Sequence, residues 1–383
     1  MTAFMDPDTI LTNAILVLPD ETVTGTIAMK GATIVGLDTG RSSLPGAIDM
    51  EGDYLIPGIV DLHTDNLERQ VQPRTLSRWP SRSAMVAHDS QCAAAGITTI
   101  FDALCLGDLG FDKDRIRTFH DGVKDLDALA PTGLLKVEHF LHLRCEVPAT
   151  DTLALVEAVI KHRLVRLISL MDHSPGVGQY ANMDFYRKLR RSGGLDEETV
   201  ERRIRELQDQ RVRLRDPNRR ALLAMARPRD VPIASHDDRT VEEIAENAAD
   251  GITISEFPVT LAAAKAAKKA GMQVIAGAPN IVRGGSHSGN VSVSDLVNAH
   301  AVDAFASDYV PPSLVEAAFL CAQQERMSLP AAIGMVTDVP ARMVGLQERG
   351  RLALWCRADV ARVRVHEALP VVRQVWCGGA RVM

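Results

Sequence analysis

The His63-Thr64-Asp65 segment is the place in this sequence where residue types and spacing most clearly suit chemistry. His63 and Asp65 are two residues apart, so on a β-strand both side chains point to the same side. An imidazole nitrogen and a carboxylate oxygen together suit one divalent cation. A His-x-Asp pair alone is weak evidence, because capping and chance produce many. Its position after Pro57-Gly58 and a strand-rich N-terminus favours a metal site.

Further metal ligands are expected where other apolar runs end. We predict His236, in ASHDD, and Asp308, in ASDY, as metal-site residues, and Asp308 also suits proton transfer. The alternatives are a core histidine for His236 and a helix cap for Asp308. Histidine with carboxylates admits Zn²⁺, Mn²⁺ or Fe²⁺, as one or two ions, and leaves a place for a water molecule whose pKa the metal lowers.

The run EHFLHLRCE offers several candidates of its own. If strand alternation holds, Glu138, His142, Arg144 and Glu146 share a side. Glu146 is nearest the carboxyl end and is predicted to complete or bridge the metal site, whereas Arg144 suits a phosphate or carboxylate. Three residues are predicted to support the ligands rather than bind metal: His142, His173 and Glu256.

The segment GAPNIVRGGSHSGN (277–290) combines a guanidinium, hydroxyls, an imidazole and a flexible backbone. This composition is typical of an oxyanion or phosphate cradle, and a merely flexible loop is the alternative. The predicted phosphate-binding residues are Arg283, Gly284, Gly285, Ser286, His287 and Ser288.

The elements that must position these residues alternate between strand and helix. Short apolar runs end in polar residues, and most are followed by helix-compatible sequence, which predicts a parallel (β/α)8 barrel with its active site at the carboxyl ends. The runs lack polar alternation, as strands buried on both faces do. The eight predicted runs are 58–66, 96–104, 134–146, 164–173, 231–238, 251–258, 272–280 and 302–309.

Both ends of the chain have a different pattern, with short alternating strands between Gly, Asp and Pro. We predict a small β-sandwich domain built from 1–56 and 346–383, around a barrel at 57–345. Residues 184–229 are dense in Arg and Glu and predict a helical excursion after the fourth strand. It is interpreted as a solvated helix pair or a subunit contact, which makes a homodimer plausible; a basic lid over an anionic substrate is the alternative.

Composition limits the classes of partner. The chain has 383 residues, 46% hydrophobic and 24% charged, with a formal net charge of −6, so neither a nucleic-acid groove nor a membrane surface is indicated. The six cysteines are scattered, which favours buried thiols over disulfides. The sequence has no secretory leader pattern and no long apolar run, and a cytoplasmic location is expected.

These features together resemble the amidohydrolase superfamily over essentially the whole chain. The resemblance rests on YLIPGIVDLHTDN, GITTIFDA, His236, Asp308 and TDVPARMVGLQERGRLALWCRADV. It is nearest to the diphosphatase branch of the carbon–phosphorus lyase pathway, whose motif order matches WPSRSAMVAHDS, EHFLHLRCE, SLMDHSPG, ASHDD, EFPVT, GAPNIVRGGSHSGN and ASDY.

The resemblance implies a metal-dependent hydrolase that cleaves α-D-ribose 1-methylphosphonate 5-triphosphate, a phosphorylated sugar, to the 5-phosphate and pyrophosphate. It implies metal ligation by His63, Asp65, His236 and Asp308, with Asp308 as proton shuttle, and substrate contacts from Arg283 and His287. The usual superfamily pair is His-x-His, and His-x-Asp here agrees with the phosphonate branch. The strand-four lysine that often bridges two metals has no counterpart in LVRLISLMDH.

Two other function classes stay open at this point. A hydrolase or deaminase acting on cyclic amide, N-acyl or amino-heterocycle C–N bonds would use the same scaffold and be indifferent to Arg283. A non-catalytic scaffold subunit would tolerate the loss of His63 and Asp308.

Overall fold

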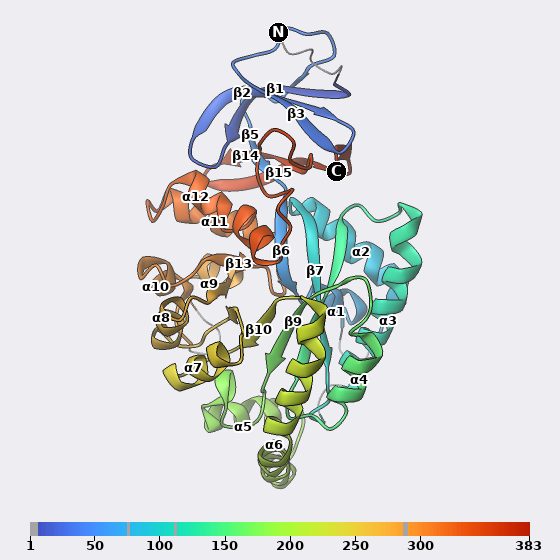
Figure 1. Cartoon of the computed structure of the whole chain (residues 1–383), viewed down its shortest axis with the longest axis vertical. Coiled ribbons are helices and arrows are strands. Elements are labelled where there is room, and N and C mark those ends of the chain that lie inside the picture. Colours follow the sequence, from blue (N-terminus) through green and yellow to red (C-terminus); the bar gives the residue numbers. More distant parts are fainter. Residues whose placement is uncertain (1–6, 75–76, 111–112, 286–289) are drawn as a thin grey trace.

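The computed structural model describes residues 7–383 except 75–76, 111–112 and 286–289. A barrel surrounded by helices forms the larger part of the molecule, and a smaller sheet lies at one end of it (Figure 1). Helices α5 (Met183–Ser192) and α6 (Glu197–Ala226) lie at the opposite end.

The barrel consists of eight parallel strands that follow one another around the sheet in chain order. A bridge between Thr64 and Asp308 brings the last strand beside the first. Each strand overlaps one of the eight predicted runs, so the predicted (β/α)8 fold is confirmed. The strands are β6 (Ile59–Thr64), β7 (Ile97–Leu106), β8 (Glu138–Glu146), β9 (Val165–Met171), β10 (Ile233–His236), β11 (Ile254–Glu256), β12 (Gln273–Gly277) and β13 (Ala304–Ala306).

Helices cover the outside of the barrel, and local sequence explains where several of them begin. Thr240 and Glu243 form a reciprocal capping box at the start of α7, and the Thr260 hydroxyl caps α8. In order, the helices outside the excursion, α7 and α8 included, are α1 (Asn66–Val71), α2 (Ser81–Ala94), α3 (Lys113–Leu129), α4 (Thr152–Val159), α7 (Val241–Ala249), α8 (Leu261–Lys269), α9 (Ala278–Arg283), α10 (Val293–Asn298), α11 (Ser313–Gln323), α12 (Leu329–Gly334) and α13 (Asp338–Met343).

The barrel strands are buried on both faces. Every residue of β6 and β7 is buried, which explains why these runs show no polar alternation. Leu104 and Leu141 on the strands belong to the same apolar core as Phe119 and Leu126 of α3.

The smaller sheet is built from both termini. In it β5 pairs antiparallel with β14 and parallel with β1, so the two ends of the chain meet inside one sheet. Leu11, Ile27, Leu55, Val360 and Trp376 form its buried core. The strands are β1 (Thr9–Val17), β2 (Thr22–Lys30), β3 (Thr33–Thr39), β4 (Ile48–Asp49), β5 (Tyr54–Pro57), β14 (Val360–His366), β15 (Leu369–Cys377) and β16 (Ala380–Arg381).

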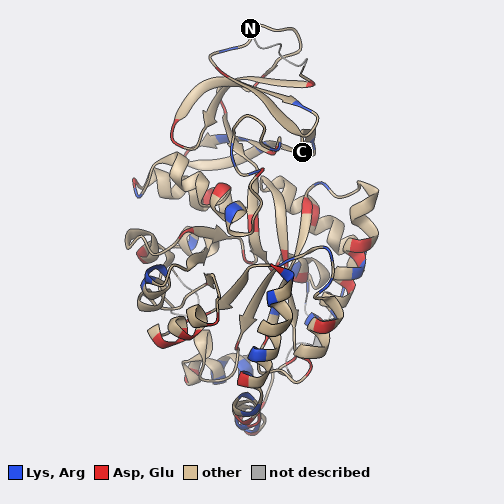
Figure 2. Ribbon diagram, in the orientation of Figure 1, with Lys and Arg blue, Asp and Glu red and all other residues tan. Residues whose placement is uncertain are grey.

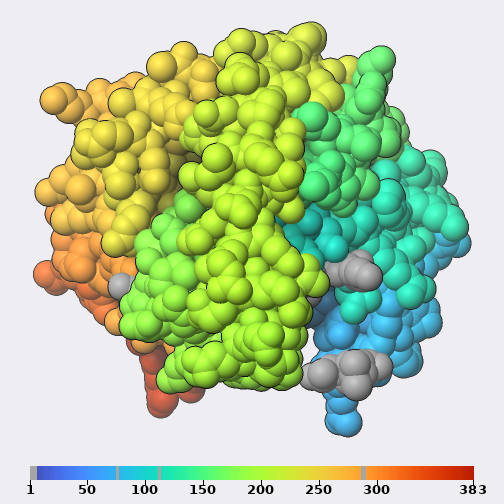
Figure 3. Space-filling model, turned by 90° about the horizontal axis from the view of Figure 1, so that it is seen from below, coloured from blue at the N-terminus to red at the C-terminus, as the bar shows by residue number. Residues whose placement is uncertain are grey.

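The segment after β9 forms the helix pair α5 and α6, which has a small core of its own around Tyr186, Val200 and Ile204. Figure 2 shows charges of both signs interspersed along α6. Seen from below, α5 and α6 cover the middle of the molecular face (Figure 3, light green to yellow-green). The pair thus lies over the end of the barrel opposite the small sheet.

All six cysteines are free, five of them buried, as the scattered spacing predicted. Within the described chain, no helix combines the length and apolar character that a membrane span needs.

Candidate active site

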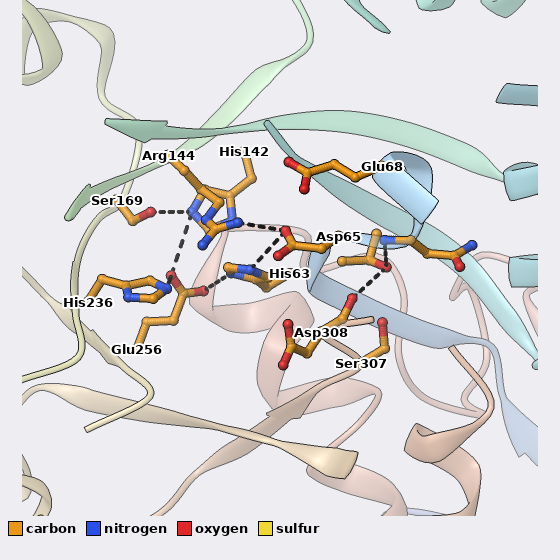
Figure 4. A network of polar contacts seen from close by, with 12 residues as sticks. His63, Asp65, Glu68, His142, Arg144, Ser169, His236, Glu256, Ser307 and Asp308 are labelled. Carbon is orange, nitrogen blue, oxygen red and sulfur yellow. Dashed lines mark hydrogen bonds and ion pairs between the residues drawn. The ribbon is translucent and has the colours of Figure 1, made fainter. Parts of the chain in front are cut away.

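The carboxyl ends of the barrel strands bring the predicted polar residues together. Figure 4 shows side chains from β8, β10 and β11, from the end of β6 and from the segment after β13 pointing toward one another. Parallel strands end at the same rim, so residues distant in sequence meet there. The labelled residues from these elements include His63, Asp65, His142, Arg144, His236, Glu256 and Asp308.

Glu256 lies between three histidines at the centre of this group. Its Oε1 accepts a hydrogen bond from His63 Nδ1 at 2.8 Å, and its Oε2 lies 3.9 Å from His142 Nε2 and 4.0 Å from His236 Nε2. Burial opposes the carboxylate charge, but the charges and hydrogen bond of the surrounding histidines, His63 foremost, together lower the pKa of Glu256 to about 2. Glu256 is therefore the anion around which the histidines are arranged.

His63 is fixed by this contact with its second nitrogen directed elsewhere. Nε2 lies 3.5 Å from Asp65 Oδ1. Burial disfavours a charged ring, yet the Glu256 carboxylate reverses this and raises the pKa of His63 to about 10. A carboxylate behind one ring nitrogen is the usual arrangement for a histidine that ligates a cation through the other.

His142 is a neutral ring in contact with the same carboxylate. Burial lowers the pKa of His142 to about 3. Its Nδ1–H donates to the Leu62 carbonyl at 3.0 Å, so Nε2 accepts from the Ser169 hydroxyl at 2.9 Å. The ring fills the barrel interior and holds its position without a charge.

A second group comprises His173, His236 and Asp237. His236 Nδ1 lies 3.2 Å and His173 Nε2 lies 3.6 Å from Asp237 Oδ2. Glu146 accepts hydrogen bonds from the backbone N–H and Nδ1 of His173, both at 2.7 Å. Burial opposes a charge on His173, but the Glu146 and Asp237 carboxylates together overcome it and raise the pKa of His173 to about 9.

Asp65, Arg144 and Asp308 form the third contact group. Arg144 Nη1 donates to Asp65 Oδ1 at 2.7 Å, and although burial acts against it, this guanidinium holds the pKa of Asp65 well below its usual range. Burial, and then the negative charge of Asp65, raise the pKa of Asp308 to about 6. Of these two neighbouring carboxyls, Asp65 is therefore charged, whereas Asp308 takes up a proton at a pH not far below neutral.

The backbone is strained at three of these strand ends. Asp237 and Phe257 directly follow β10 and β11, and Asp308 is the second residue after β13; their φ values are 57°, 55° and 55°. Left-handed backbone costs free energy in residues with a Cβ and is concentrated at functional sites. Here it turns the chain immediately after His236, Glu256 and Ser307.

Several buried polar atoms in the site have no hydrogen-bond partner within the described residues. Leaving such atoms unpaired is costly, and a cation would satisfy lone pairs of this kind. The ligand atoms of His63, Asp65 and Asp308 lie within 4.8 Å of one another, and so do those of the second group. This donor set fits one or two divalent cations. The unpartnered atoms are His63 Nε2, His173 Nε2, both ring nitrogens of His236, Asp237 Oδ2 and Glu256 Oε2.

These groups open into a cavity of about 360 Å³. Besides the histidines and carboxylates, arginines from four separate elements line it. Four guanidiniums around one cavity suit a ligand that carries several negative charges. They are Arg115 of α3, Arg144 of β8, Arg190 of α5 and Arg283 at the end of α9.

The predicted site residues occupy different places around this cavity. Glu146 lies in its wall with both oxygens engaged by His173, and it is outside the groups of converging ligand atoms found in the described chain. His142, His173 and Glu256, predicted as supports, belong to those groups. Arg283 and Gly285 line the cavity and Gly284 ends α9 in left-handed backbone. The predicted Ser286, His287 and Ser288 lie outside the described residues.

Sequence reasoning missed Asp237 as a site residue, although it follows His236 directly in ASHDD. The signal was the strand end itself, where every polar residue is a candidate. It also missed Tyr180, which lines the cavity from the turn Gly178–Tyr180. Arg190 lines the cavity as well, from the segment 184–229, for which a basic lid over an anionic substrate was the alternative interpretation.

A second histidine–carboxylate cluster lies outside the barrel wall, beneath α2. His88 Nε2 donates to Asp102 Oδ1 at 2.7 Å, and His139 Nδ1 donates to Asp102 Oδ2 at 2.8 Å. His139 Nε2 lies 3.3 Å from Asp89 Oδ1, and Asn66 donates to His88 Nδ1 at 3.0 Å. Each ring nitrogen of His88 and His139 and each carboxylate oxygen of Asp89 and Asp102 has a hydrogen-bond partner.

Comparisons with known proteins show the family and the fold of the chain. No family model matches the chain. It is 41% identical over 376 residues to α-D-ribose 1-methylphosphonate 5-triphosphate diphosphatase of Escherichia coli strain K12, a match covering 97% of this chain and all of that protein.

Solved structures with the same fold have lower identity. N-isopropylammelide isopropylaminohydrolase from Burkholderia multivorans has a TM-score of 0.64 and 18% identity, with 97% of both chains covered. Dihydropyrimidinase from Brevibacillus agri has a TM-score of 0.62 and 12% identity, covering 97% of this chain and 94% of that one. At such identities the likeness establishes the fold alone. Because the E. coli relative is 41% identical and spans nearly the whole chain, this chain belongs to the α-D-ribose 1-methylphosphonate 5-triphosphate diphosphatase family.

Proposed function

We propose that the protein hydrolyses α-D-ribose 1-methylphosphonate 5-triphosphate to the 5-phosphate and pyrophosphate in phosphonate catabolism. The observation that carries the proposal is the cavity in which four arginines surround the unpartnered histidine and carboxylate atoms. The E. coli relative, named for this activity, supports it. A C–N hydrolase acting on a neutral ring would have no use for four guanidiniums.

Divalent metal belongs to the proposal. His63, Asp65 and Asp308 would hold one cation and His173, His236 and Asp237 a second, with Glu256 between the two groups. Such a cation supplies positive charge that neutralises phosphate oxygens and makes a water molecule more acidic. Zinc, manganese and iron all suit this donor set.

The protein's own residues account for the proton and for the phosphate charge. Asp308, whose pKa burial and Asp65 raise to about 6, accepts a proton from the attacking water near neutral pH. Arg144, held by Asp65, orients the phosphate chain beside it. Arg283, with the predicted Ser286 and His287, holds another anionic part of the substrate.

Three broader expectations accompany the proposal. We expect 1–56 and 346–383 to form one composite unit and 57–345 to form the catalytic barrel, and the pairing of β5 with β14 in one sheet supports this division. A cytoplasmic location suits a phosphorylated sugar substrate, and a homodimer is proposed through the excursion.

The test is product identity. Metal-loaded protein incubated with the 5-triphosphate should release pyrophosphate and the 5-phosphate, followed by ³¹P NMR and an orthophosphate assay. Release of orthophosphate alone, or no turnover, would overturn the proposal. Turnover of dihydropyrimidine or N-acyl substrates in the same preparation would favour the C–N hydrolase instead.

A further inference from the structure

One side of the cavity wall has no role in the proposed reaction so far. It is formed by the turn η2 (Gly178–Tyr180) and by α5, which belong to the segment between β9 and β10. Tyr180 and Arg190 from these two elements line the same cavity as the metal-site candidates. The excursion therefore contributes directly to the site, as well as lying across the barrel end in Figure 3.

The Arg190 guanidinium packs on two tyrosine rings that touch each other, so it lies beside the pair and not between the rings. Its Cζ lies 4.9 Å from the ring centroid of Tyr186 and 5.7 Å from that of Tyr180. The two rings meet edge to face with centroids 5.4 Å apart, and Tyr186 is 1% exposed in the small core with Val200 and Ile204. A guanidinium on a ring face can still donate hydrogen bonds through its planar edge.

Tyr180 also connects this arginine to the second candidate ligand group. Its ring packs edge to face on His173, with centroids 5.8 Å apart, and His173 packs on His236 at 5.6 Å. Arg190 is thus one aromatic ring away from a histidine of the proposed metal site. A phosphate chain that begins at the metal site reaches the guanidinium after passing this ring.

The arginines are unevenly distributed around the cavity. Arg144 and Arg190 belong to β8 and to the segment after β9, whereas Arg283 follows β12. Because β8 and β12 are four strands apart in an eight-stranded barrel, Arg283 faces the other two across the mouth. Arg115, which follows β7, adds a third guanidinium on the first side.

The proposed substrate is also uneven, with an anionic group at each end. A terminal phosphate carries a charge of about −1.5 to −2 at pH 7 and three acceptor oxygens. A methylphosphonate ester carries a single charge. Matching the larger charge to the larger number of guanidiniums places the leaving pyrophosphate on the side of β7 to β9.

Resting on the proposed function, we propose that Arg190, packed on the rings of Tyr180 and Tyr186, binds the terminal phosphate of the leaving pyrophosphate and selects triphosphates over diphosphates. The methylphosphonate end then points toward Arg283. A 5-diphosphate is too short by one phosphate to engage Arg190, so this contact distinguishes the two substrates.

The selectivity test uses Arg190→Gln, Arg190→Lys and a matched control from the same helix. Arg187→Gln is the control, because Arg187 donates to Glu201 of α6 at 2.6 Å and lies outside the cavity lining. Arg190→Gln should lower kcat/KM for the 5-triphosphate by about 10- to 100-fold and leave the 5-diphosphate rate nearly unchanged. For Arg190→Lys, kcat/KM for the 5-triphosphate should lie between those of wild type and Arg190→Gln, because lysine keeps the charge and loses the planar stack.

Inhibition by compounds that resemble each end of the substrate tests the orientation of the substrate in the cavity. Inorganic pyrophosphate should inhibit Arg190→Gln at least about tenfold more weakly than it inhibits wild type. Inhibition by a methylphosphonate ester should be the same in both proteins. Equal losses on triphosphate and diphosphate, or weaker inhibition by the phosphonate ester in place of pyrophosphate, would overturn the assignment.

A binding measurement separates this inference from the proposed function. If wild type fails to release pyrophosphate, the proposed function fails, and calorimetric titration of inorganic pyrophosphate into the folded protein still tests Arg190. Binding that weakens in Arg190→Gln and not in Arg187→Gln is the expected result. Equal binding by the two variants contradicts the subsite, and matching thermal melts exclude misfolding as the cause.

Discussion

Two buried histidine–carboxylate clusters lie on opposite sides of the same barrel wall. The inner cluster, around His63 and Glu256, faces the cavity at the strand ends. The outer cluster, around Asp102 and His139, lies between the wall and α2. His139 and His142 are three residues apart on β8 and belong to different clusters, because strand alternation sends them to opposite sides.

The clusters differ in how far their polar atoms are satisfied. In the outer cluster Asp102 accepts from two histidines, and both rings use both nitrogens. In the inner cluster His63 Nε2 and both nitrogens of His236 lack hydrogen-bond partners among the described residues. Residue types are therefore the same in a cluster whose polar atoms are all paired and in the cluster that we propose to bind metal. Unsatisfied atoms distinguish them.

The largest expected effect is on the inner cluster. His63→Asn should lower kcat/KM by about a thousandfold or more and reduce bound metal, because it removes a ring nitrogen from the proposed ligand set. Pyrophosphate release and elemental analysis of the purified variant measure both. The variant with the matched substitution His88→Asn in the outer cluster should keep the wild-type metal content. A His63→Asn enzyme with full metal and activity would contradict the comparison.

Asp308→Asn should reduce kcat by about 10²- to 10⁴-fold, since the amide cannot accept the proton from water. Its stability should be unchanged or increased, because burial and Asp65 disfavour the charged carboxyl, as the raised pKa of Asp308 indicates. Steady-state kinetics and urea unfolding of the same preparation measure the two quantities. A clear loss of stability would show that Asp308 is a structural residue.

The outer cluster should show the opposite behaviour. Asp102→Asn removes the charge shared by two buried histidines and leaves His139 without its main partner. We expect a loss of about 3–5 kcal/mol in the free energy of unfolding. Metal content per folded molecule should stay at the wild-type level. A change below about 1 kcal/mol would mean that the pairing adds little to the fold.

The smallest expected effect is on the pH dependence of stability. Burial opposes the charge on His139, but Asp102 outweighs it and raises the pKa of His139 from 6.5 to about 9. A raised histidine pKa contributes stability that is complete below pH 6.5 and is lost as pH rises through 9. The loss over this range should be on the order of 3 kcal/mol in wild type.

His139→Gln is the variant that isolates this contribution. The glutamine does not titrate, so urea unfolding between pH 6.5 and 9 should give a flatter profile than wild type. Equal slopes in the two proteins would assign the pH dependence to other groups.

The sequence by itself determined the barrel strands and the candidate ligands at their carboxyl ends. Each strand is recognisable from a local apolar run, and His63, Asp65, His236 and Asp308 stand where such runs stop. Strand ends are local features, and parallel strands in a barrel must end at one rim. The predicted ligands could therefore be brought together without knowledge of their contacts.

Only the tertiary structure decided how those residues are used. Glu256 became the centre because it reaches His63 across 193 positions of sequence. Glu146 lies in the wall because His173 occupies both of its oxygens, and Arg190 enters the cavity because the excursion packs around Tyr186. Such contacts depend on which side a residue faces and on what lies opposite it. Both are set by long-range packing, which the local pattern of types and spacings does not contain.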